Sequence, residues 1–428
     1  MEFTSVIDKK KNKLELSKEE ITYAVNSYTN GEIPDYQMSS LLMAILLNGM
    51  TNDEVFNLTE VMMNSGDILD LSRFGGKVVD KHSTGGIGDK TTIILGPILA
   101  TLGCKVAKIS GRGLGITGGT ADKLESIEGY NISLSKEEFL KQVEDIGISL
   151  SYNIGNLAPA DKKIYALRDV TATVDSIPLI ASSIMSKKLA SGADAIVLDV
   201  KVGKGAFMKD VNEARKLANL MIDIGKHFGR KVKAVLTNMD IPLGYNIGNR
   251  IEVEECVGVL EGKGEHNLTL ISVALASHLL NMISDKPIGE CQQLVLESIA
   301  NGSALNKFKE LVKAQGGNYD NIFVNNNKTY TLKASKSGYV TDINSELVGL
   351  SSMEIKVGRE TKEDQIDYEA GIKFLKRIND SVNEGDNIAI IYYKEGSNLE
   401  EAIRLLDESI TIEDSKVEEP TLIYEVIG

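Results

Sequence analysis

Helix-like and strand-like spacing of apolar residues alternates along this chain and divides it into regions. The first part is helical: residues 16–21 carry a capping box, residues 39–47 are apolar nearly all round, and residues 51–54 begin a further helix. Residues 159–189 return to a helical pattern. We expect these two stretches to pack together as one helical layer.

From residue 78 the pattern changes to short β-branched runs separated by helix-like segments. Residues 78–79, 106–109, 195–198 and 232–236 predict buried strands, and residues 91–102 predict a helix between the first two. Strands that alternate with helices indicate an α/β domain with a largely parallel sheet.

A third region begins near residue 328. Residues 329–332, 338–340 and 388–392 are strand-like, and one helix is expected near 368–378. The predicted fold class is therefore α/β, with a small all-helical domain, a large α/β domain with a mainly parallel central sheet, and a C-terminal α+β region. The expected boundaries are 1–66 and 158–190 for the helical domain, 74–157 and 191–325 for the α/β domain, and 328–428 for the C-terminal region.

Two glycine-rich loops follow the first two predicted strands, at residues 81–92 and 108–122. Glycine lets the backbone approach a ligand closely, and N–H groups at a helix start favour anions. Lys81, Lys108 and Arg112 lie beside these loops. The pattern predicts a phosphate held from both sides.

Other interpretations of these loops are weaker. Gly113, Gly115 and Gly118 match a dinucleotide fingerprint, but five glycines in nine residues produce that spacing by chance, and no acidic strand end follows. His82 stands at the mouth of the first loop. A lone histidine is more often structural, yet its neighbours here favour a functional role, and its ordinary pKa near neutrality allows proton transfer.

Composition narrows the functional classes. The net charge is −14, from 47 basic and 61 acidic residues, which argues against a nucleic-acid partner or an anionic membrane. No secretion signal or membrane span is expected. The three cysteines have no metal-ligand spacing and fit a reducing, cytoplasmic setting.

Two further polar segments stand out. Residues 168–176 and 182–188 form one; a solvated helix face is the plain interpretation, although Arg168 suits a planar ligand. The other is a turn-rich loop at 242–249 with three glutamates behind it. Its carbonyls and one carboxylate are oxygen ligands of the kind that hard cations prefer.

These motifs resemble the family of pyrimidine-nucleoside and thymidine phosphorylases. The resemblance is carried by residues 81–89, 110–126 and 168–174, and it extends over essentially the whole chain, including 158–162, 199–208 and 422–425. It implies reversible phosphorolysis of uridine, thymidine or deoxyuridine to free base and pentose 1-phosphate, by direct attack of phosphate. It also implies a homodimer through the helical domain and no organic cofactor.

The resemblance assigns roles to individual positions. The implied phosphate ligands are Lys81, Ser83, Thr92, Lys108, Ser110 and Thr120. The implied base ligands are Arg168, Ser183 and Lys187, with His82 near a pyrimidine carbonyl; His82, Arg168 and Lys187 are the implied catalytic residues. A K⁺ ion is implied at Gly88, Lys90, Leu243, Asn246 and Glu255, mostly through backbone carbonyls.

The chain departs from the family pattern at three positions. Ile116 stands where a histidine is common, Lys90 replaces a small hydroxyl residue, and Asn246 replaces an alanine. An inward Lys90 ammonium would compete with the ion, whereas an outward one would leave the carbonyl free. The sequence leaves this open, as it does the preferred nucleoside and the physiological direction.

Two other functions compete with the phosphorylase. One is a pentosyl transferase that uses phosphoribosyl pyrophosphate; it usually needs carboxylates for magnesium, and no matching pair lies beside the loops. The other is a nucleoside or phosphate binder that has lost turnover through Ile116. Against it stand the intact residues Lys81, His82, Ser110, Arg168 and Lys187.

Overall fold

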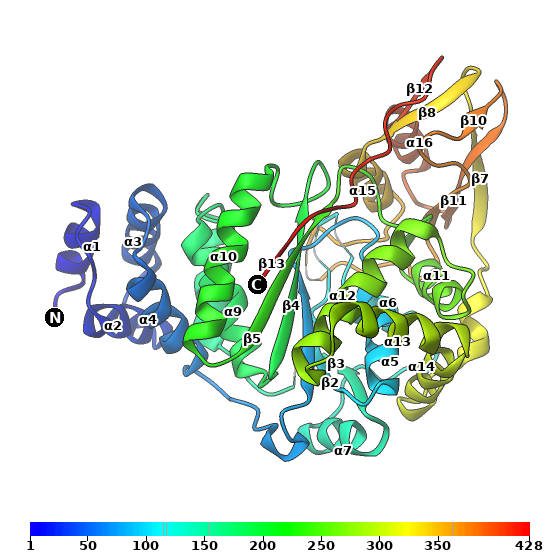
Figure 1. Cartoon of the computed structure of the whole chain (residues 1–428). Helices are drawn as coiled ribbons and strands as arrows, with labels where there is room; N and C mark the ends of the chain where they lie inside the picture. Colours follow the sequence, from blue (N-terminus) through cyan, green and yellow to red (C-terminus); the bar gives the residue numbers. More distant parts are fainter. Residues whose placement is uncertain (114, 117, 153, 362) are drawn as a thin grey trace.

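The computed structural model describes residues 1–428 except 114, 117, 153 and 362. A helical layer is built from two separate stretches of chain (Figure 1). Its helices are α1 Phe3–Lys11, α2 Lys18–Thr29, α3 Asp35–Asn48, α4 Asn52–Met63, α8 Pro159–Asp169 and α9 Ile177–Ala190. Ala160, Ile164 and Leu179 share one core cluster with residues of α1 to α4. The expected return of the chain to the first helices is thus observed.

Capping explains where several helices begin. Ser17 and Ser135 each accept a hydrogen bond from the N–H three residues later, and Glu20 and Glu138 reach back to the cap. Thr51 and Glu54 form the same arrangement before α4. Each pair satisfies two N–H groups that a helix start would otherwise leave unpaired.

Among the described residues, the central sheet has six strands in the order β13-β5-β4-β1-β2-β3. They are β1 Val78–Ser83, β2 Lys105–Ile109, β3 Ile148–Ser151, β4 Ala195–Val202, β5 Lys231–Asn238 and β13 Ile423–Ile427. The first five are parallel, and β13 is antiparallel to β5. Because β1 and β2 are neighbours, the loops that follow them lie at the same edge of the sheet.

Helices cover both faces of this sheet. α10 Val211–His227 packs on β4 and β5 and also on α9, so it joins the sheet to the helical layer. The other face carries α5 Thr91–Thr101 and α12 His266–Ser284, surrounded by α11 Arg250–Leu260, α13 Ile288–Ala300 and α14 Ser303–Ala314. Two further helices, α6 Thr120–Glu125 and α7 Lys136–Ile146, follow the second glycine loop.

One described helix, α12, is long and apolar enough to cross a membrane by those two criteria alone. Leu268, Ile271 and Leu275 of this helix are buried in the same core cluster as Ile93 and Ile98 of α5. The apolar character of α12 is therefore used in packing within the protein.

In the part of the chain that the structure describes, the C-terminal region contains two antiparallel sheets. One has the order β10-β8-β12 and the other β6-β9-β11-β7. Their strands are β6 Asn246–Gly248, β7 Lys328–Lys333, β8 Gly338–Ile343, β9 Gly371–Phe374, β10 Ser381–Val382, β11 Asn387–Tyr393 and β12 Ile410–Glu413. Two helices, α15 Ser345–Glu354 and α16 Leu399–Glu408, pack against each other beside them.

Three features of this region differ from the sequence expectations. The helix expected near 368–378 is instead strand β9, in which Ile372 and Phe374 are buried on one side. β6 lies within the stretch expected to be α/β but pairs with β9. Conversely, β13 lies within the expected C-terminal region but completes the central sheet. The two regions therefore exchange strands.

Candidate active site

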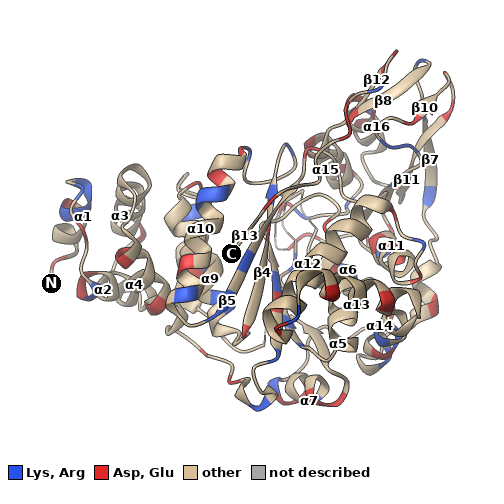
Figure 2. Cartoon of the chain, in the orientation of Figure 1, with Lys and Arg blue, Asp and Glu red and all other residues tan. Residues whose placement is uncertain are grey.

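A cleft of about 510 Å³ lies where the two glycine loops meet the helical layer. Its walls come from the ends of β1 and β2, from Tyr152 and residues 154–157, and from the end of α9. This volume lies in the range of ordinary small-molecule sites. Acidic residues are spread over the helical layer and over the helices that cover the central sheet (Figure 2). The lysines gathered at this cleft are a local exception to the negative net charge of the chain.

The structure brings all six expected phosphate ligands to this cleft. The lining residues include Lys81, Ser83, Thr92, Lys108, Ser110 and Thr120. Gly85 has a φ of 94°, which favours glycine, and its N–H donates to the Ser83 hydroxyl at 3.2 Å. The Ser110 hydroxyl is buried and has no hydrogen-bond partner among the described residues. A buried hydroxyl without a partner at the wall of a cleft points to a ligand.

Lys81 is held by two carboxylates. Its Nζ lies 2.9 Å from Asp89 Oδ2 and 3.2 Å from Asp199 Oδ2. Burial lowers the pKa of Lys81, but the two carboxylates reverse this effect and raise the pKa above its usual value. Lys81 is therefore a fixed positive charge at the base of the first loop.

Lys108 has a less complete set of partners. Its Nζ donates to Asp80 Oδ1 at 2.9 Å and to the Lys81 carbonyl at 2.6 Å, but Asp80 also pairs with Lys188 at 2.7 Å. Burial lowers the pKa of Lys108 to about 7, Asp80 opposes this, and the neighbouring Lys188 adds to it. One carboxylate shared by two lysines leaves this corner with an excess of positive charge, which suits an anion.

His82 lies in the same cleft. Burial, followed by the charges of Lys188 and Lys108, lowers the pKa of His82 well below its ordinary value. The imidazole is therefore neutral at neutral pH. This argues against the imidazolium form that the unperturbed pKa allowed.

The expected base ligands are only partly at the cleft. Lys187 lines it, and its Nζ pairs with Asp161 Oδ2 at 2.7 Å and lies 3.3 Å from the Ser183 hydroxyl. Ser183 itself is buried one turn earlier in α9 and is not among the residues that line the cleft.

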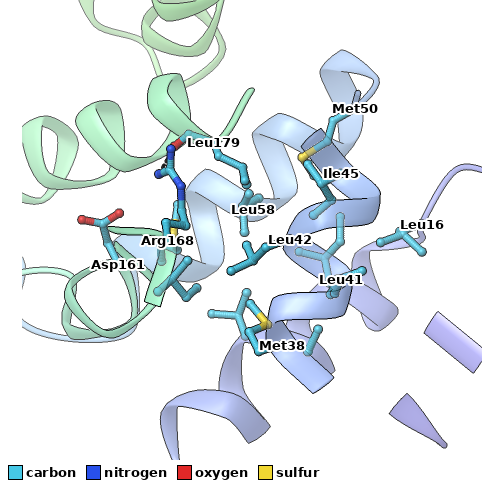
Figure 3. Close-up of a pocket in the computed structure, with 15 residues that line it drawn as sticks. Leu16, Met38, Leu41, Leu42, Ile45, Met50, Leu58, Asp161, Arg168 and Leu179 are labelled. Carbon is cyan, nitrogen blue, oxygen red and sulfur yellow. Dashed lines mark hydrogen bonds between the residues drawn. The ribbon is translucent and has the colours of Figure 1, made fainter. Parts of the chain in front are cut away.

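Arg168 is not brought to the cleft in this conformation. Its guanidinium donates to the carbonyls of Thr173 at 3.2 Å, Val174 at 2.8 Å and Leu179 at 3.2 Å. It borders a separate apolar cavity of about 20 Å³ inside the helical layer (Figure 3). The expected contact with a ligand is replaced here by contacts that fix the turn between α8 and α9.

The residues expected to hold a cation do come together, around the Lys90 side chain. Lys90 Nζ lies 3.0 Å from the Leu243 carbonyl, 2.7 Å from the Asn246 carbonyl and 2.5 Å from Glu255 Oε2. Of the two orientations that the sequence left open, the inward one is observed. These residues do not fit a bound metal ion, because an ammonium already takes the oxygen atoms that would ligate it.

The tip of the second loop packs on the C-terminal region. Ile116 is half-buried against the apolar core, and a Cβ added to Gly349 of α15 would lie 2.9 Å from its Cβ. Leu114 and Thr117 of the matched motif lie outside the described residues.

Several residues that build the site had no assigned role from the sequence. Asp80 and Lys188 form the ion pair that affects the pKa of Lys108. The sequence contains one sign of this role, which is that Lys188 is the neighbour of Lys187. Arg359 makes a two-pronged contact with Asp122, at 3.0 and 2.9 Å, and donates to the Gly113 carbonyl. Arg359 thus holds the second loop from 237 residues away, a contact that local pattern does not reveal.

Comparison with known proteins gives matches along the whole chain. Residues 4–66 match the glycosyl transferase family helical bundle domain, residues 75–305 the glycosyl transferase family a/b domain, and residues 339–413 the pyrimidine nucleoside phosphorylase C-terminal domain. Pyrimidine-nucleoside phosphorylases of Staphylococcus haemolyticus and Geobacillus stearothermophilus are 48% and 46% identical, each over the full length of both chains.

A solved structure of a more distant protein has a similar fold. Anthranilate phosphoribosyltransferase from Thermus thermophilus aligns with a TM-score of 0.59 at 18% identity, covering 72% of this chain and 98% of the other. That likeness concerns the fold alone. The full-length identity and the three domain matches are more specific, and by them this chain belongs to the pyrimidine-nucleoside phosphorylase family.

Proposed function

We propose that this protein catalyses the reversible phosphorolysis of pyrimidine nucleosides at the cleft between the glycine loops and the helical layer. The observation that carries the proposal is the single cleft shared by Lys81, Lys108 and the unpartnered Ser110 hydroxyl on one wall and Lys187 on the other. Full-length identity of 48% to a named pyrimidine-nucleoside phosphorylase supports the same reaction.

The phosphate wall supplies the nucleophile. An oxygen of phosphate forms a bond to the anomeric carbon of the pentose while the bond from that carbon to the base nitrogen breaks. Lys81, Lys108 and the loop hydroxyls hold the phosphate beneath the sugar, so an encounter of two molecules becomes a step within one complex. No covalent intermediate with the protein is required.

The opposite wall receives the leaving base. The base departs with the electron pair of the broken bond, and Lys187 is the described cationic group on this wall that also reaches Ser183. A charge placed where negative charge develops stabilises the transition state more than the ground state. Neutral His82 donates an N–H hydrogen bond to a pyrimidine carbonyl, without transfer of a proton.

Arg168 and Ser183 enter this mechanism through a movement of the helical layer. Arg168 lies in α8 and Ser183 lies in α9, the helix that also carries Lys187, and neither residue lines the cleft in this conformation. We expect closure on a nucleoside to bring them toward the base. Crystals grown with phosphate and uracil, compared with ligand-free crystals, test this; identical positions of α8 and α9 would contradict closure.

The reaction is tested by following the ultraviolet absorbance of uridine, thymidine and deoxyuridine with and without phosphate. Phosphate-dependent release of base is the expected result, and the three rates give the preferred nucleoside. Base release that needs pyrophosphate instead, or none from any substrate by a folded protein that binds uracil, would contradict the proposal.

Assembly as a homodimer through the helical layer is part of the proposal. Helix α3 exposes two large side chains, Leu47 by 74% and Tyr36 by 73%, which a partner copy would cover. Light scattering of the protein and of a Leu47→Glu variant tests this assembly.

The three cysteines are unpaired and buried, which supports a reducing, cytoplasmic setting.

A further inference from the structure

Lys90 is an almost fully buried charged side chain in the first glycine loop, and it lies behind the cleft wall. It directly precedes α5, its residue is 1% exposed, and it does not line the cleft. The reaction proposed above makes no use of it. A buried charge without a role in the chemistry requires a structural explanation.

Its contacts account for all of its donors. A lysine ammonium has three N–H donors and no acceptor. Three oxygen atoms face it within 3.0 Å, namely the carbonyls of Leu243 and Asn246 and Glu255 Oε2. A compact single positive charge surrounded by two carbonyls and one carboxylate is also the description of a bound monovalent cation.

The same carboxylate closes the oxygen cage. Glu255 accepts from the N–H of Tyr245 at 2.5 Å and of Asn246 at 3.1 Å, so its two oxygens shape the loop that supplies the carbonyls. Gly88, the remaining expected member, lets the loops approach, because a Cβ there would lie 2.4 Å from the Leu243 carbonyl oxygen.

The cage has no room for a second charge. A Cβ added to Gly244 would lie 2.8 Å from Lys90 Nζ and 2.5 Å from Glu255 Oε2. A metal ion bound to the same oxygens would also stand directly against the ammonium, and repulsion between like charges at such a separation is severe in a buried site.

The cage joins three parts of the fold. Lys90 ends the first glycine loop, the two carbonyls belong to the segment that leads into β6, and Glu255 lies in α11. From the C-terminal region, Arg377 donates to the carbonyls of Gly244 and Pro242 in the same segment. A cation here therefore fixes the phosphate loop to the junction with the C-terminal region.

We propose that the Lys90 ammonium is a built-in monovalent cation, so that this enzyme needs no K⁺ for stability or for the alignment of its phosphate loop. Replacing Lys90 by a small hydroxyl residue should open the cage and create a K⁺ site that this chain does not otherwise have. The proposal concerns ion binding and stability, so it stands or falls independently of the reaction.

The test compares the wild-type protein with Lys90→Ser and Lys90→Met in KCl, NaCl and choline chloride at one ionic strength. The wild-type melting temperature should be the same in all three salts. Lys90→Ser should melt lower in choline chloride, on the order of 10 °C, and KCl should restore much of the loss. Lys90→Met fills the space without a charge, so KCl should not restore it.

Crystals soaked in rubidium chloride provide a second measurement that requires no turnover. Rubidium should give an anomalous peak between the Leu243 and Asn246 carbonyls in Lys90→Ser and none there in the wild type. A wild-type peak at that position, or a wild-type melting temperature that rises specifically with K⁺, would overturn the proposal. So would a Lys90→Ser protein that folds but does not respond to K⁺. If Lys90→Ser does not fold, the wild-type measurements still decide.

Discussion

Two buried lysines lie at the glycine loops, Lys90 in the first and Lys108 at the start of the second, and their surroundings differ in one respect. Lys90 donates to Glu255 and to two carbonyls, and although burial lowers its pKa, Glu255 and the nearby Glu252 raise it above its usual value. Lys108 shares Asp80 with Lys188, and burial lowers its pKa to about 7. The satisfied lysine lies behind the cleft, and the unsatisfied one lines it. For these two lysines the complete set of partners belongs to the structural charge, whereas Lys81, which also has complete partners, lines the cleft.

The largest expected effect comes from removing the unsatisfied charge. Lys108→Met should lower the rate of phosphorolysis by about 10²- to 10³-fold, the range for losing one charge-stabilising donor. Stability should not fall, because burial of the charged Lys108 opposes folding and Asp80 keeps Lys188 as its partner. Steady-state kinetics and thermal melting measure the two effects. Lys141→Met, at an exposed lysine on α7, is the matched control. A Lys108→Met protein that melts far below the wild type would contradict the distinction between Lys108 and Lys90.

The satisfied pair should behave in the opposite way. Glu255→Gln leaves the buried Lys90 charge without its counter-ion and should cost about 3 kcal/mol of unfolding free energy, measured by denaturant titration. The double variant Lys90→Met with Glu255→Gln removes both charges and should be less destabilised than Glu255→Gln alone. Additive losses would show that the two groups do not act as a pair.

The pH dependence should separate binding from stability. Above pH 7 the Lys108 ammonium loses its proton, so the KM for phosphate should rise as pH increases through about 7. The free energy of unfolding should increase over the same range, although phosphate binding weakens. Between about pH 7 and pH 10 the unfolded chain, with a lysine pKa near 10.4, binds more protons than the native state, and stability therefore rises with pH. In Lys108→Met both trends should flatten; trends that persist there arise from other groups, including phosphate itself.

The smallest expected effect concerns the unpartnered hydroxyl. Ser110→Ala removes a hydrogen bond to phosphate but none within the described protein, so the KM for phosphate should rise about 3- to 10-fold with an unchanged melting temperature. Ser182→Ala, at a buried serine in α9 outside the cleft, serves as the control. A fall in melting temperature for Ser110→Ala would show that the hydroxyl has a structural partner after all.

Local sequence signals predicted much of this fold because their physical causes are local. Capping boxes at Ser17 and Ser135 depend on atoms three residues apart, and the strands before the glycine loops depend on short β-branched runs. The gathering of Lys81, Lys108 and Ser110 also followed, since adjacent parallel strands place their ends together.

The remaining features depend on contacts that no local pattern contains. Whether Lys90 points inward is decided by carbonyls more than 150 residues later in the chain. The Arg168 guanidinium donates to carbonyls of the turn that follows α8. An arginine at this position would suit an external ligand equally well, so the residue type alone does not decide between the two contacts. Residues 368–378 have apolar positions that suit either a helix or a strand, and pairing of β9 with β11 selected the strand.

The exchange of strands between the central sheet and the C-terminal region has a consequence for biosynthesis. Tyr424, within β13, hydrogen-bonds to Asn238, 186 residues earlier, and β13 covers the edge of β5. Until β13 leaves the ribosome, β5 presents an open edge capable of pairing with another chain. Nascent protein should therefore depend on chaperones until late in translation, and neither region should be transferable to another protein as an independent module.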